Sequence, residues 1–133
     1  MSRLDLKRVL YVEDEPNIRT VGRFALEEVG GMTVETAASG QEALEKARLF
    51  APDVVLLDVM MPGMDGVETF RALRLLESTA CVPIIFMTAK VQPQEVASYK
   101  NLGALAVIAK PFDPLTLPDE VRTLWAGHRE EGS

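Results

Sequence analysis

The stretch that decides the fold is Val54-Val55-Leu56-Leu57-Asp58-Val59-Met60-Met61-Pro62-Gly63-Met64-Asp65-Gly66. Its four leading apolar residues, two of them β-branched, predict a short strand buried on both faces. The Pro62-Gly63 pair then indicates a turn that leaves the sheet. A carboxylate at the end of such a strand stays ionised only beside a cation or hydrogen-bond donors. Asp58 therefore either begins a loop or belongs to a polar site, and the rest of the chain favours the site.

The composition is typical of one soluble globular domain. We expect a single domain over residues 1–133, with a core at about 7–127 and a polar tail at 128–133. The formal net charge of −6 argues against direct binding of nucleic acid or of an anionic membrane. The single cysteine, Cys81, cannot form an internal disulfide, which fits a reducing compartment. Since the sequence has no signal peptide and no membrane-spanning run, it predicts a cytoplasmic protein.

Strand-like apolar runs alternate with segments of helical periodicity along the chain. Strands are expected at residues 9–12, 32–37, 54–58, 84–88 and 104–109. Helices are expected from Pro16 to the Gly30-Gly31 pair, after the capping residues Ser39 and Asp65, from about Pro93 to Leu102, and finally up to about Ala126. Five strands alternating with five helices predict an α/β fold, in which helices cover both faces of a parallel sheet.

The last helix contains a local conflict between its cap and its prolines. If Asp113 caps this helix and Pro114 starts it, Pro118 falls in the second turn and removes a backbone hydrogen bond there. We therefore predict an irregular first turn, with regular helix only from about Pro118.

Polar residues follow four of the predicted strands. Glu13 and Asp14 follow the first strand, while Asp58, Thr88 and Lys110 end or follow the third, fourth and fifth. Ligands of open parallel sheets bind outside the carboxyl ends of the strands, near the point where the strand order reverses. We therefore expect these five side chains to share one rim of the sheet.

Three carboxylates on one rim repel one another unless a cation neutralises them. Oxygen ligands suit a hard ion, and Mg²⁺ is typically held by one or two carboxylates, waters and phosphate oxygens. A ligating aspartate can also act as a nucleophile and form an aspartyl phosphate. The Lys110 ammonium and the Thr88 hydroxyl could stabilise the phosphoryl oxygens, so the pattern predicts a phosphoryl-transfer site. Taken singly, Lys110 could instead be a counter-charge and Thr88 an ordinary strand-end hydroxyl.

In combination and order, these residues resemble the response-regulator receiver domains of two-component signalling, over about residues 7–127. The matching motifs are Val9-Leu10-Tyr11-Val12-Glu13-Asp14-Glu15-Pro16, the stretch from Asp58 to Gly66, Thr88-Ala89 and Lys110-Pro111-Phe112. The resemblance implies a doubly wound, flavodoxin-like (βα)5 fold with strand order 2-1-3-4-5. It also implies that the peptide bond between Lys110 and Pro111 is cis.

The resemblance further implies a role for each site residue. Asp58 would accept a phosphoryl group from a sensor histidine kinase or a histidine phosphotransfer protein, and Thr88 and Lys110 would hold the phosphoryl oxygens. Mg²⁺ would be bound by Glu13 (directly or through water), Asp14, Asp58 and the backbone carbonyl of Met60. The phosphorylated form would change its binding to a downstream protein, and whether it forms a homodimer is left open. Such a domain catalyses only its own phosphorylation and dephosphorylation.

Two positions depart from the family's common pattern. Glu13 stands where the family more often has an aspartate, so its reach to the metal differs by one methylene. Val107 stands where the family commonly has Tyr or Phe, so this face would respond weakly to phosphorylation or by another route. Met60 and Lys90 occupy positions that vary in the family and tend to tune phosphate lifetime.

Two other functions remain as alternatives. An aspartate-nucleophile phosphatase usually carries a second aspartate two residues after the nucleophile, where this chain has Met60. An interaction module that is never phosphorylated would be expected to have lost some of the acids, Thr88 or Lys110, and all are present.

Overall fold

The structure is a computed structural model that describes the backbone of residues 6–131 and the side chains of residues 6–128. Its strands in these residues are β1 (Arg8–Val12), β2 (Thr33–Ala37), β3 (Val54–Asp58), β4 (Ile84–Thr88) and β5 (Ala106–Ala109). All neighbouring strands pair in parallel, in the order β2-β1-β3-β4-β5. The predicted α/β fold and its strand order are therefore confirmed, and the carboxyl ends of all the strands meet at one edge.

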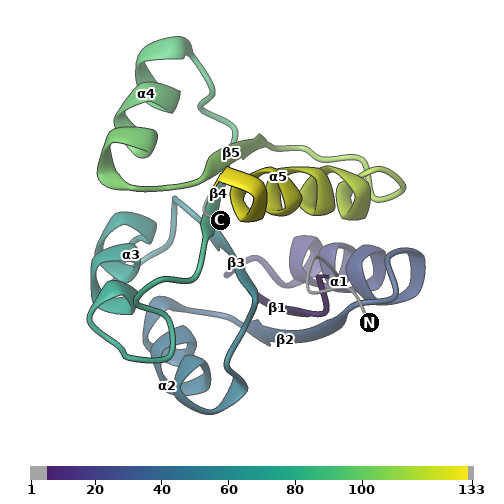
Figure 1. Cartoon of the computed structure of the whole chain (residues 1–133), viewed down its shortest axis with the longest axis horizontal. Helices are drawn as coiled ribbons and strands as arrows, with labels where there is room; N and C mark the ends of the chain where they lie inside the picture. Colours follow the sequence, from purple (N-terminus) through teal and green to yellow (C-terminus); the bar gives the residue numbers. More distant parts are fainter. Residues whose placement is uncertain (1–5, 132–133) are drawn as a thin grey trace.

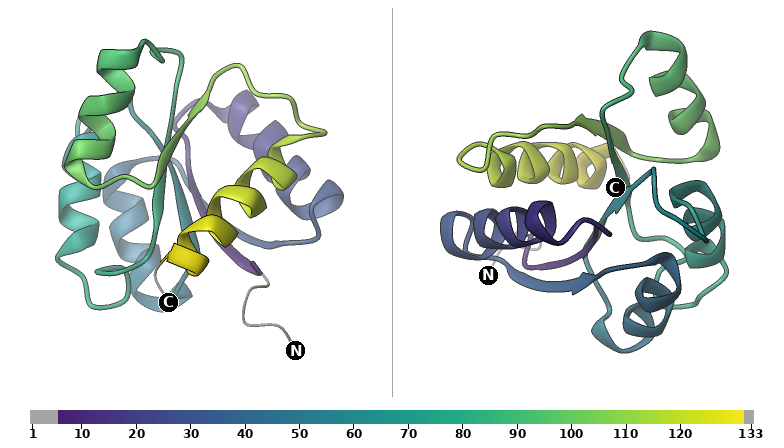
Figure 2. Two further views of the ribbon diagram at one scale, coloured as in Figure 1. Left: turned by 45° about the horizontal axis from the view of Figure 1, so that its top comes forward. Right: turned by 180° about the vertical axis from the view of Figure 1, so that it is seen from behind.

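Helices cover both faces of the sheet (Figures 1 and 2). They are α1 (Pro16–Phe24), η1 (Ala25–Val29), α2 (Gly40–Phe50), α3 (Gly66–Arg74), α4 (Pro93–Leu102) and α5 (Leu117–Glu131). In Figure 1, α1 and α5 lie on one side of the sheet and α2, α3 and α4 on the other. Successive crossovers place the helices in this way because right-handed βαβ units pack back onto the sheet.

The core consists of two layers, one on each face of the sheet. One layer joins β1 and β3 to the helices η1 and α5, and the other joins the same strands to α2 and α3. Strand β3 contributes to both layers, and its five residues are all buried. This is the double-sided burial that the apolar run at residues 54–57 predicts.

Local capping positions two helices as the sequence predicts. The Ser39 hydroxyl accepts a hydrogen bond from the backbone N–H of Glu42 and starts α2. Asp65 and Glu68 form a complete capping box at the start of α3. Both pairs satisfy N–H groups that the first turn of a helix leaves without partners.

The helix expected from Pro16 to Gly30 changes geometry in its second half. Residues Ala25–Val29 form a π-helical segment, in which the backbone N–H of Gly30 donates to the carbonyl of Ala25. The wider turn accompanies full burial of two consecutive residues, Ala25 and Leu26. An ordinary helical periodicity does not predict this pattern.

The final strand and helix differ from the predicted boundaries. The backbone N–H of Ala104 donates to the Tyr99 carbonyl and closes α4, so β5 begins at Ala106 and not at residue 104. A turn precedes regular helix from Leu117, as the prolines predict. The helix then continues past Ala126 to Glu131. The predicted end of the helix at about Ala126 is therefore too early, and residues 132–133 lie outside the described part.

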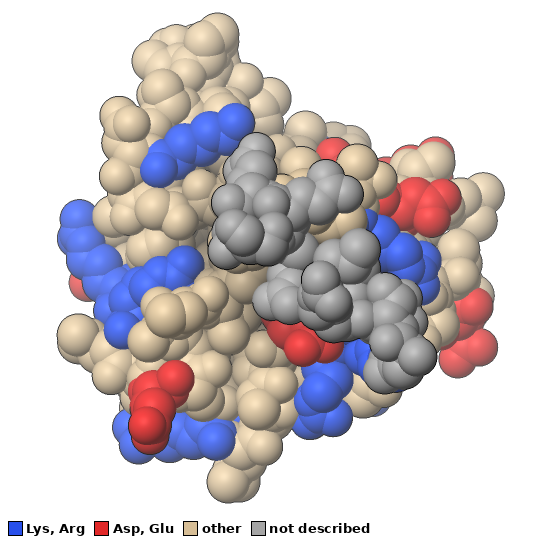
Figure 3. All heavy atoms as spheres, in the orientation of Figure 1, with Lys and Arg blue, Asp and Glu red and all other residues tan. Residues whose placement is uncertain are grey.

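The surface carries charge of both signs. Figure 3 shows Lys and Arg side chains among Asp and Glu on one face, without one continuous acidic surface. Among the described residues, no helix combines the length and the apolar character needed to cross a bilayer.

Candidate functional site

Three acidic side chains come together at the carboxyl edge of the sheet. Glu13 and Asp14 follow β1, and Asp58 ends the neighbouring strand β3. One carboxylate oxygen from each residue lies within 4.8 Å of the other two. Glu13 is 1% exposed and Asp58 is 3% exposed, while Asp14 is half-buried. Two of the three charges therefore lie where water can stabilise them only weakly.

Lys110 supplies the cation that lies against this cluster. It follows β5, and its Nζ donates to Glu13 Oε1 at 2.9 Å and to Asp58 Oδ1 at 3.2 Å. These partners are 97 and 52 residues away along the chain, so only the folded sheet brings them together. The peptide bond from Lys110 to Pro111 is cis, as the family resemblance implies.

The environment shifts the proton affinity of the two central groups. Burial raises the pKa of Asp58 to about 7, with a further upward contribution from the charge of Glu13, while Lys110 opposes the rise. Burial also acts to lower the pKa of Lys110, but its bonds to Glu13 and Asp58 outweigh burial and raise that pKa. Asp58 therefore combines a buried carboxylate oxygen with a neighbouring ammonium that can balance negative charge.

A pocket of about 320 Å³, here called the acidic pocket, opens above these groups. Its lining includes all six residues that the sequence analysis selected, namely Glu13, Asp14, Asp58, Met60, Thr88 and Lys110. Thr88 is buried at the end of β4, and its hydroxyl accepts a hydrogen bond from the backbone N–H of Lys90 at 3.1 Å. Met60 is 63% exposed at the rim.

Arg19 of α1 is a functional candidate that the sequence analysis did not select. Its Nη1 donates to the carbonyl of Glu13 at 2.8 Å and to the carbonyl of Asp14 at 3.3 Å. The same turn is tied to β2 by a bond from the Glu13 N–H to the Ala37 carbonyl. These bonds hold the backbone of both acids, so Arg19 orients carboxylates that it does not itself contact. Helical spacing alone gives no sign of such a role.

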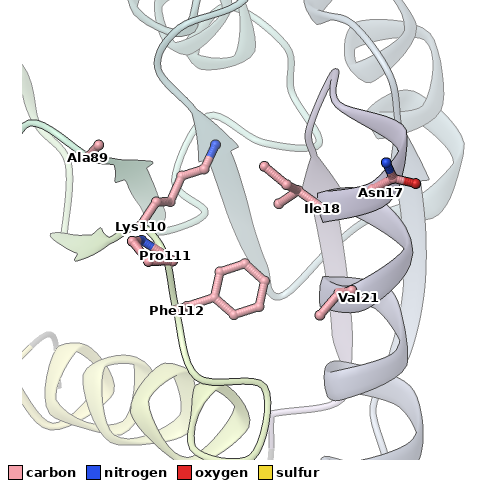
Figure 4. A pocket seen from close by; sticks show the side chains of 7 residues that line it. All are labelled: Asn17, Ile18, Val21, Ala89, Lys110, Pro111 and Phe112. Carbon is pink, nitrogen blue, oxygen red and sulfur yellow. The ribbon is translucent and has the colours of Figure 1, made fainter.

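An apolar groove of about 480 Å³ adjoins the acidic pocket. Figure 4 shows Ile18 and Val21 of α1 on one side of it, facing Pro111 and Phe112 of the segment after β5. Ile18, Ala89 and Lys110 line both spaces. The sequence analysis missed this apolar groove because its two walls lie about 90 residues apart along the chain.

The acidic pocket fits a hard divalent cation. Its lining includes four acidic residues, of which Glu13, Asp14 and Asp58 form the cluster described above. The lining has no side-chain nitrogen or sulfur other than the Lys110 ammonium and the Met60 thioether. Mg²⁺ prefers oxygen ligands and keeps several waters, which a half-open pocket with one partly exposed acid can accommodate.

Comparisons with known proteins point to one family. The family model described as the response regulator receiver domain matches residues 9–122. The alkaline phosphatase synthesis transcriptional regulatory protein PhoP of Bacillus subtilis is 37% identical over 118 residues, which cover 89% of this chain and 48% of that protein. Sporulation initiation phosphotransferase F of the same species is 34% identical over 116 residues, which cover 87% of this chain and 91% of that protein. The chain spans about half the length of the first curated relatives that it matches.

Solved structures agree with this result. The chemotaxis protein CheY4 of Vibrio cholerae superposes with a TM-score of 0.83 at 36% identity, covering 90% of this chain and 99% of that one. The receiver domain of the sensor histidine kinase PA1611 from Pseudomonas aeruginosa superposes with a TM-score of 0.79 at 30% identity, covering 92% and 99%. That structure has a magnesium ion coordinated in its active site cleft.

Proposed function

This chain belongs to the response regulator receiver domain family, and on that basis we propose that Asp58 accepts a phosphoryl group from a phosphohistidine. The observation that carries the proposal is the position of Asp58, buried at the end of β3 with the Lys110 ammonium 3.2 Å from its Oδ1. A carboxylate oxygen can attack phosphorus, and the adjacent ammonium then balances charge on the phosphoryl oxygens.

The residues around Asp58 would stabilise the transferred group. Lys110 already reaches Asp58 and Glu13, so a small movement of its Nζ would bring it to a phosphoryl oxygen. The Thr88 hydroxyl lines the same acidic pocket and can donate a hydrogen bond while accepting one from Lys90. During transfer, negative charge is spread over the equatorial phosphoryl oxygens. The Lys110 ammonium would neutralise part of this charge, and the Thr88 hydroxyl would donate a hydrogen bond to one of these oxygens.

Glu13, Asp14, Asp58 and the Met60 carbonyl would hold Mg²⁺. When bound, the ion would supply positive charge that offsets the repulsion between the acids and the incoming phosphate. The clustering of three carboxylates supports this assignment, as does the magnesium ion in the PA1611 receiver domain. Glu13 is bonded to Lys110, so this acid either ligates the ion directly or reaches it through water.

The phosphodonor is a sensor histidine kinase or a histidine phosphotransfer protein, and the phosphorylated form binds a downstream protein differently. The similarity to sporulation initiation phosphotransferase F, of which this chain covers 91%, supports a phosphotransfer role for a single receiver domain. The receiver family is a signalling family. We therefore assign to this chain catalysis of its own phosphorylation and dephosphorylation only, without turnover of an external substrate.

The two alternative functions account for the site less well. A phosphatase needs an acid or base two residues after Asp58, and the exposed Met60 thioether can act as neither. A module that is never phosphorylated would have no need for a buried carboxylate with a raised pKa beside a lysine.

Intact-protein mass spectrometry tests the proposal. The protein is incubated with phosphoramidate and MgCl₂, beside an Asp58→Asn variant and a sample with excess EDTA. We expect one added phosphoryl group in the wild-type sample with Mg²⁺ and none in the other two. A phosphoryl group on the Asp58→Asn protein, or none on the wild type, would contradict the assignment.

A further inference from the structure

Met60 differs from the other described methionines in its exposure to solvent. Met60 is 63% exposed. Of the other methionines in residues 6–128, Met64 is half-buried and the rest are at most 7% exposed, namely Met32, Met61 and Met87. Because a dissolved reagent modifies the side chains that it can reach, Met60 is the described methionine that an oxidant in water would modify first.

The position of Met60 connects this reactive side chain to the phosphoacceptor. Met60 lies two residues after Asp58 and lines the acidic pocket. The other described residues that line this pocket offer carboxylates, a hydroxyl, an ammonium and hydrocarbon groups. Peroxides oxidise a thioether readily and leave those other groups unchanged at neutral pH. The acidic pocket therefore has one described side chain whose chemistry a peroxide can change.

We propose that Met60 is an oxidation site for peroxides, and that its sulfoxide shortens the life of a phosphoryl group on Asp58. The second half of this inference rests on the proposed function. In the reaction with hydrogen peroxide, the sulfur lone pair of Met60 attacks one peroxide oxygen, so a bond between sulfur and oxygen forms and the bond between the two oxygens breaks. The other oxygen leaves as hydroxide and takes the proton of the transferred oxygen. The thioether is thereby oxidised to a sulfoxide, and the peroxide is reduced to water.

The physical basis for the effect is a new hydrogen-bond acceptor at the rim of the acidic pocket. A thioether sulfur accepts hydrogen bonds only weakly, whereas a sulfoxide is polar and its oxygen accepts them well. Hydrolysis of an aspartyl phosphate requires a water molecule in line with the bond that breaks. The sulfoxide oxygen holds such a water, and one hydrogen bond of ordinary net strength corresponds to a rate increase of about fivefold.

Oxidation leaves the rest of the site as it is. A sulfoxide carries no net charge, so it does not oppose the pairing of Lys110 with Asp58 at 3.2 Å. The backbone carbonyl of Met60 is also chemically unchanged. The effect is therefore expected in the rate of hydrolysis, measured at a saturating concentration of MgCl₂.

The kinetic test follows oxidised and unoxidised molecules in one sample. The full chain is partly oxidised with hydrogen peroxide and then treated with dithiothreitol, which reduces reversible products at the exposed Cys81 and leaves methionine sulfoxide in place. It is phosphorylated with phosphoramidate, and the donor is removed. Intact-protein mass spectrometry then resolves phosphorylated molecules with and without one added oxygen. We expect the oxidised molecules to lose the phosphoryl group about fivefold faster.

Two leucine variants assign the effect to one residue. Met60→Leu replaces the thioether by an apolar side chain of similar size. Met61→Leu is the matched control, because Met61 is the next residue, is 7% exposed and leaves Met60 in place. We expect the difference between oxidised and unoxidised molecules to disappear in Met60→Leu and to persist in Met61→Leu. Each variant is compared with its own unoxidised molecules, so the effect of the substitution itself cancels.

Peptide mapping and enzymatic reduction complete the test without relying on the kinetics. Peptide mapping should place the added oxygen on Met60 before any of the buried methionines. Methionine sulfoxide reductase with dithiothreitol should remove that oxygen and restore the slower loss of the phosphoryl group.

The outcomes separate this inference from the proposed function. If Met60 is oxidised but both forms lose the phosphoryl group at the same rate, the sulfoxide effect is wrong and the proposed function stands. Slower loss from the oxidised molecules would also overturn the effect. If a buried methionine is oxidised before Met60, or if Met60→Leu keeps the difference, Met60 is not the site. If the untreated protein takes up no phosphoryl group, the proposed function and the second half of this inference both fail.

Discussion

Arg19 connects the acidic turn to α1 through two backbone carbonyls. Its guanidinium does not contact a carboxylate, so its effect on the site would come through the orientation of Glu13 and Asp14. We expect Arg19→Gln to weaken Mg²⁺ binding about 5–10-fold, because groups that orient metal ligands commonly have effects of this size or larger. Isothermal titration calorimetry with MgCl₂ measures the affinity.

The neighbouring Arg23 provides the matched control. It lies on the same helix and pairs with Glu27 at the surface, and it has no bond to the acidic turn. Arg23→Gln removes the same charge from α1 and is expected to change the Mg²⁺ affinity less than about twofold, as for other exposed pairs. Equal losses in the two variants would mean that only the charge of Arg19 matters.

At the scale of elements, α1 packs closely against β1 where Gly22 faces Tyr11. A Cβ atom at Gly22 would lie 2.5 Å from Cε2 of the fully buried Tyr11 ring, whose hydroxyl contacts the Ile18 carbonyl. We expect Gly22→Ala to lower the free energy of unfolding by about 2 kcal/mol, since overpacking moves either the ring or the helix. Urea denaturation monitored by circular dichroism gives this value.

Gly127 in α5 is the control for that substitution. A Cβ atom there would meet nothing within 4 Å. Gly127→Ala should therefore raise the free energy of unfolding by about 0.5–1 kcal/mol through helix propensity alone. If Gly22→Ala were also stabilising, the contact between Gly22 and Tyr11 could not be as tight as it is here.

Helix α4 packs on the domain through Tyr99 and Leu102. The helix has no buried residue, and the Tyr99 ring packs on Phe86 of β4 with centroids 5.1 Å apart. The β5 residue paired with Phe86 of β4 is Val107, which is not aromatic. The aromatic ring that packs on Phe86 near β5 is therefore Tyr99 of α4. Because Phe86 lies two residues before Thr88, Tyr99 offers another route by which a change at Thr88 could reach the surface. The expectation of a weak response at Val107 itself stays a prediction.

Amide hydrogen exchange tests this attachment. An aromatic pair contributes about 0.5–1.5 kcal/mol beyond its buried area, so Tyr99→Ala should speed exchange across residues 93–102 by roughly fivefold or more. Tyr99→Phe keeps the ring and should exchange like the wild type. Fast exchange in both variants would place the attachment in the hydroxyl group, and unchanged exchange in both would remove Tyr99 from this role.

At the scale of the whole molecule, the buried acid makes stability depend on pH when no metal is present. The pKa of Asp58 is about 7 in the folded protein, against 3.8 for an exposed aspartic acid. Between these values the folded state holds a proton that the unfolded state has lost, so raising the pH favours unfolding. The penalty is absent below about pH 4 and complete above about pH 7.

Asp58→Asn removes this penalty. In EDTA we expect the variant to gain stability over the wild type by about 1–3 kcal/mol at pH 7.5, and the gain to vanish toward pH 4. Glu77→Gln, at an exposed position in the loop after α3, is the control and should show no such change with pH. A constant difference between Asp58→Asn and the wild type from pH 4 to 7.5 would contradict the raised pKa.

The sequence by itself determined what depends on near neighbours. The fully buried strand β3, the caps at Ser39 and Asp65, and the irregular turn before Pro118 follow from residues within four positions of one another. Alternation of strands and helices then limited the fold to a parallel sheet, and the family motifs implied its order and the cis peptide bond. That the five polar side chains Glu13, Asp14, Asp58, Thr88 and Lys110 share one rim also follows, because parallel strands end at a common edge.

Only the tertiary structure decided which side chains at that rim meet, and what lies beside them. Local sequence periodicity does not predict that Lys110 pairs with both Glu13 and Asp58, or that Arg19 donates to two backbone carbonyls. Nor does it predict the tight contact of Gly22 with Tyr11 or the apolar groove. The physical reason is that periodicity specifies which face of an element is buried, whereas distances between elements depend on how side chains from remote parts of the chain pack together. The raised pKa of Asp58 has the same origin, since burial and neighbouring charge exist only once the strands have assembled.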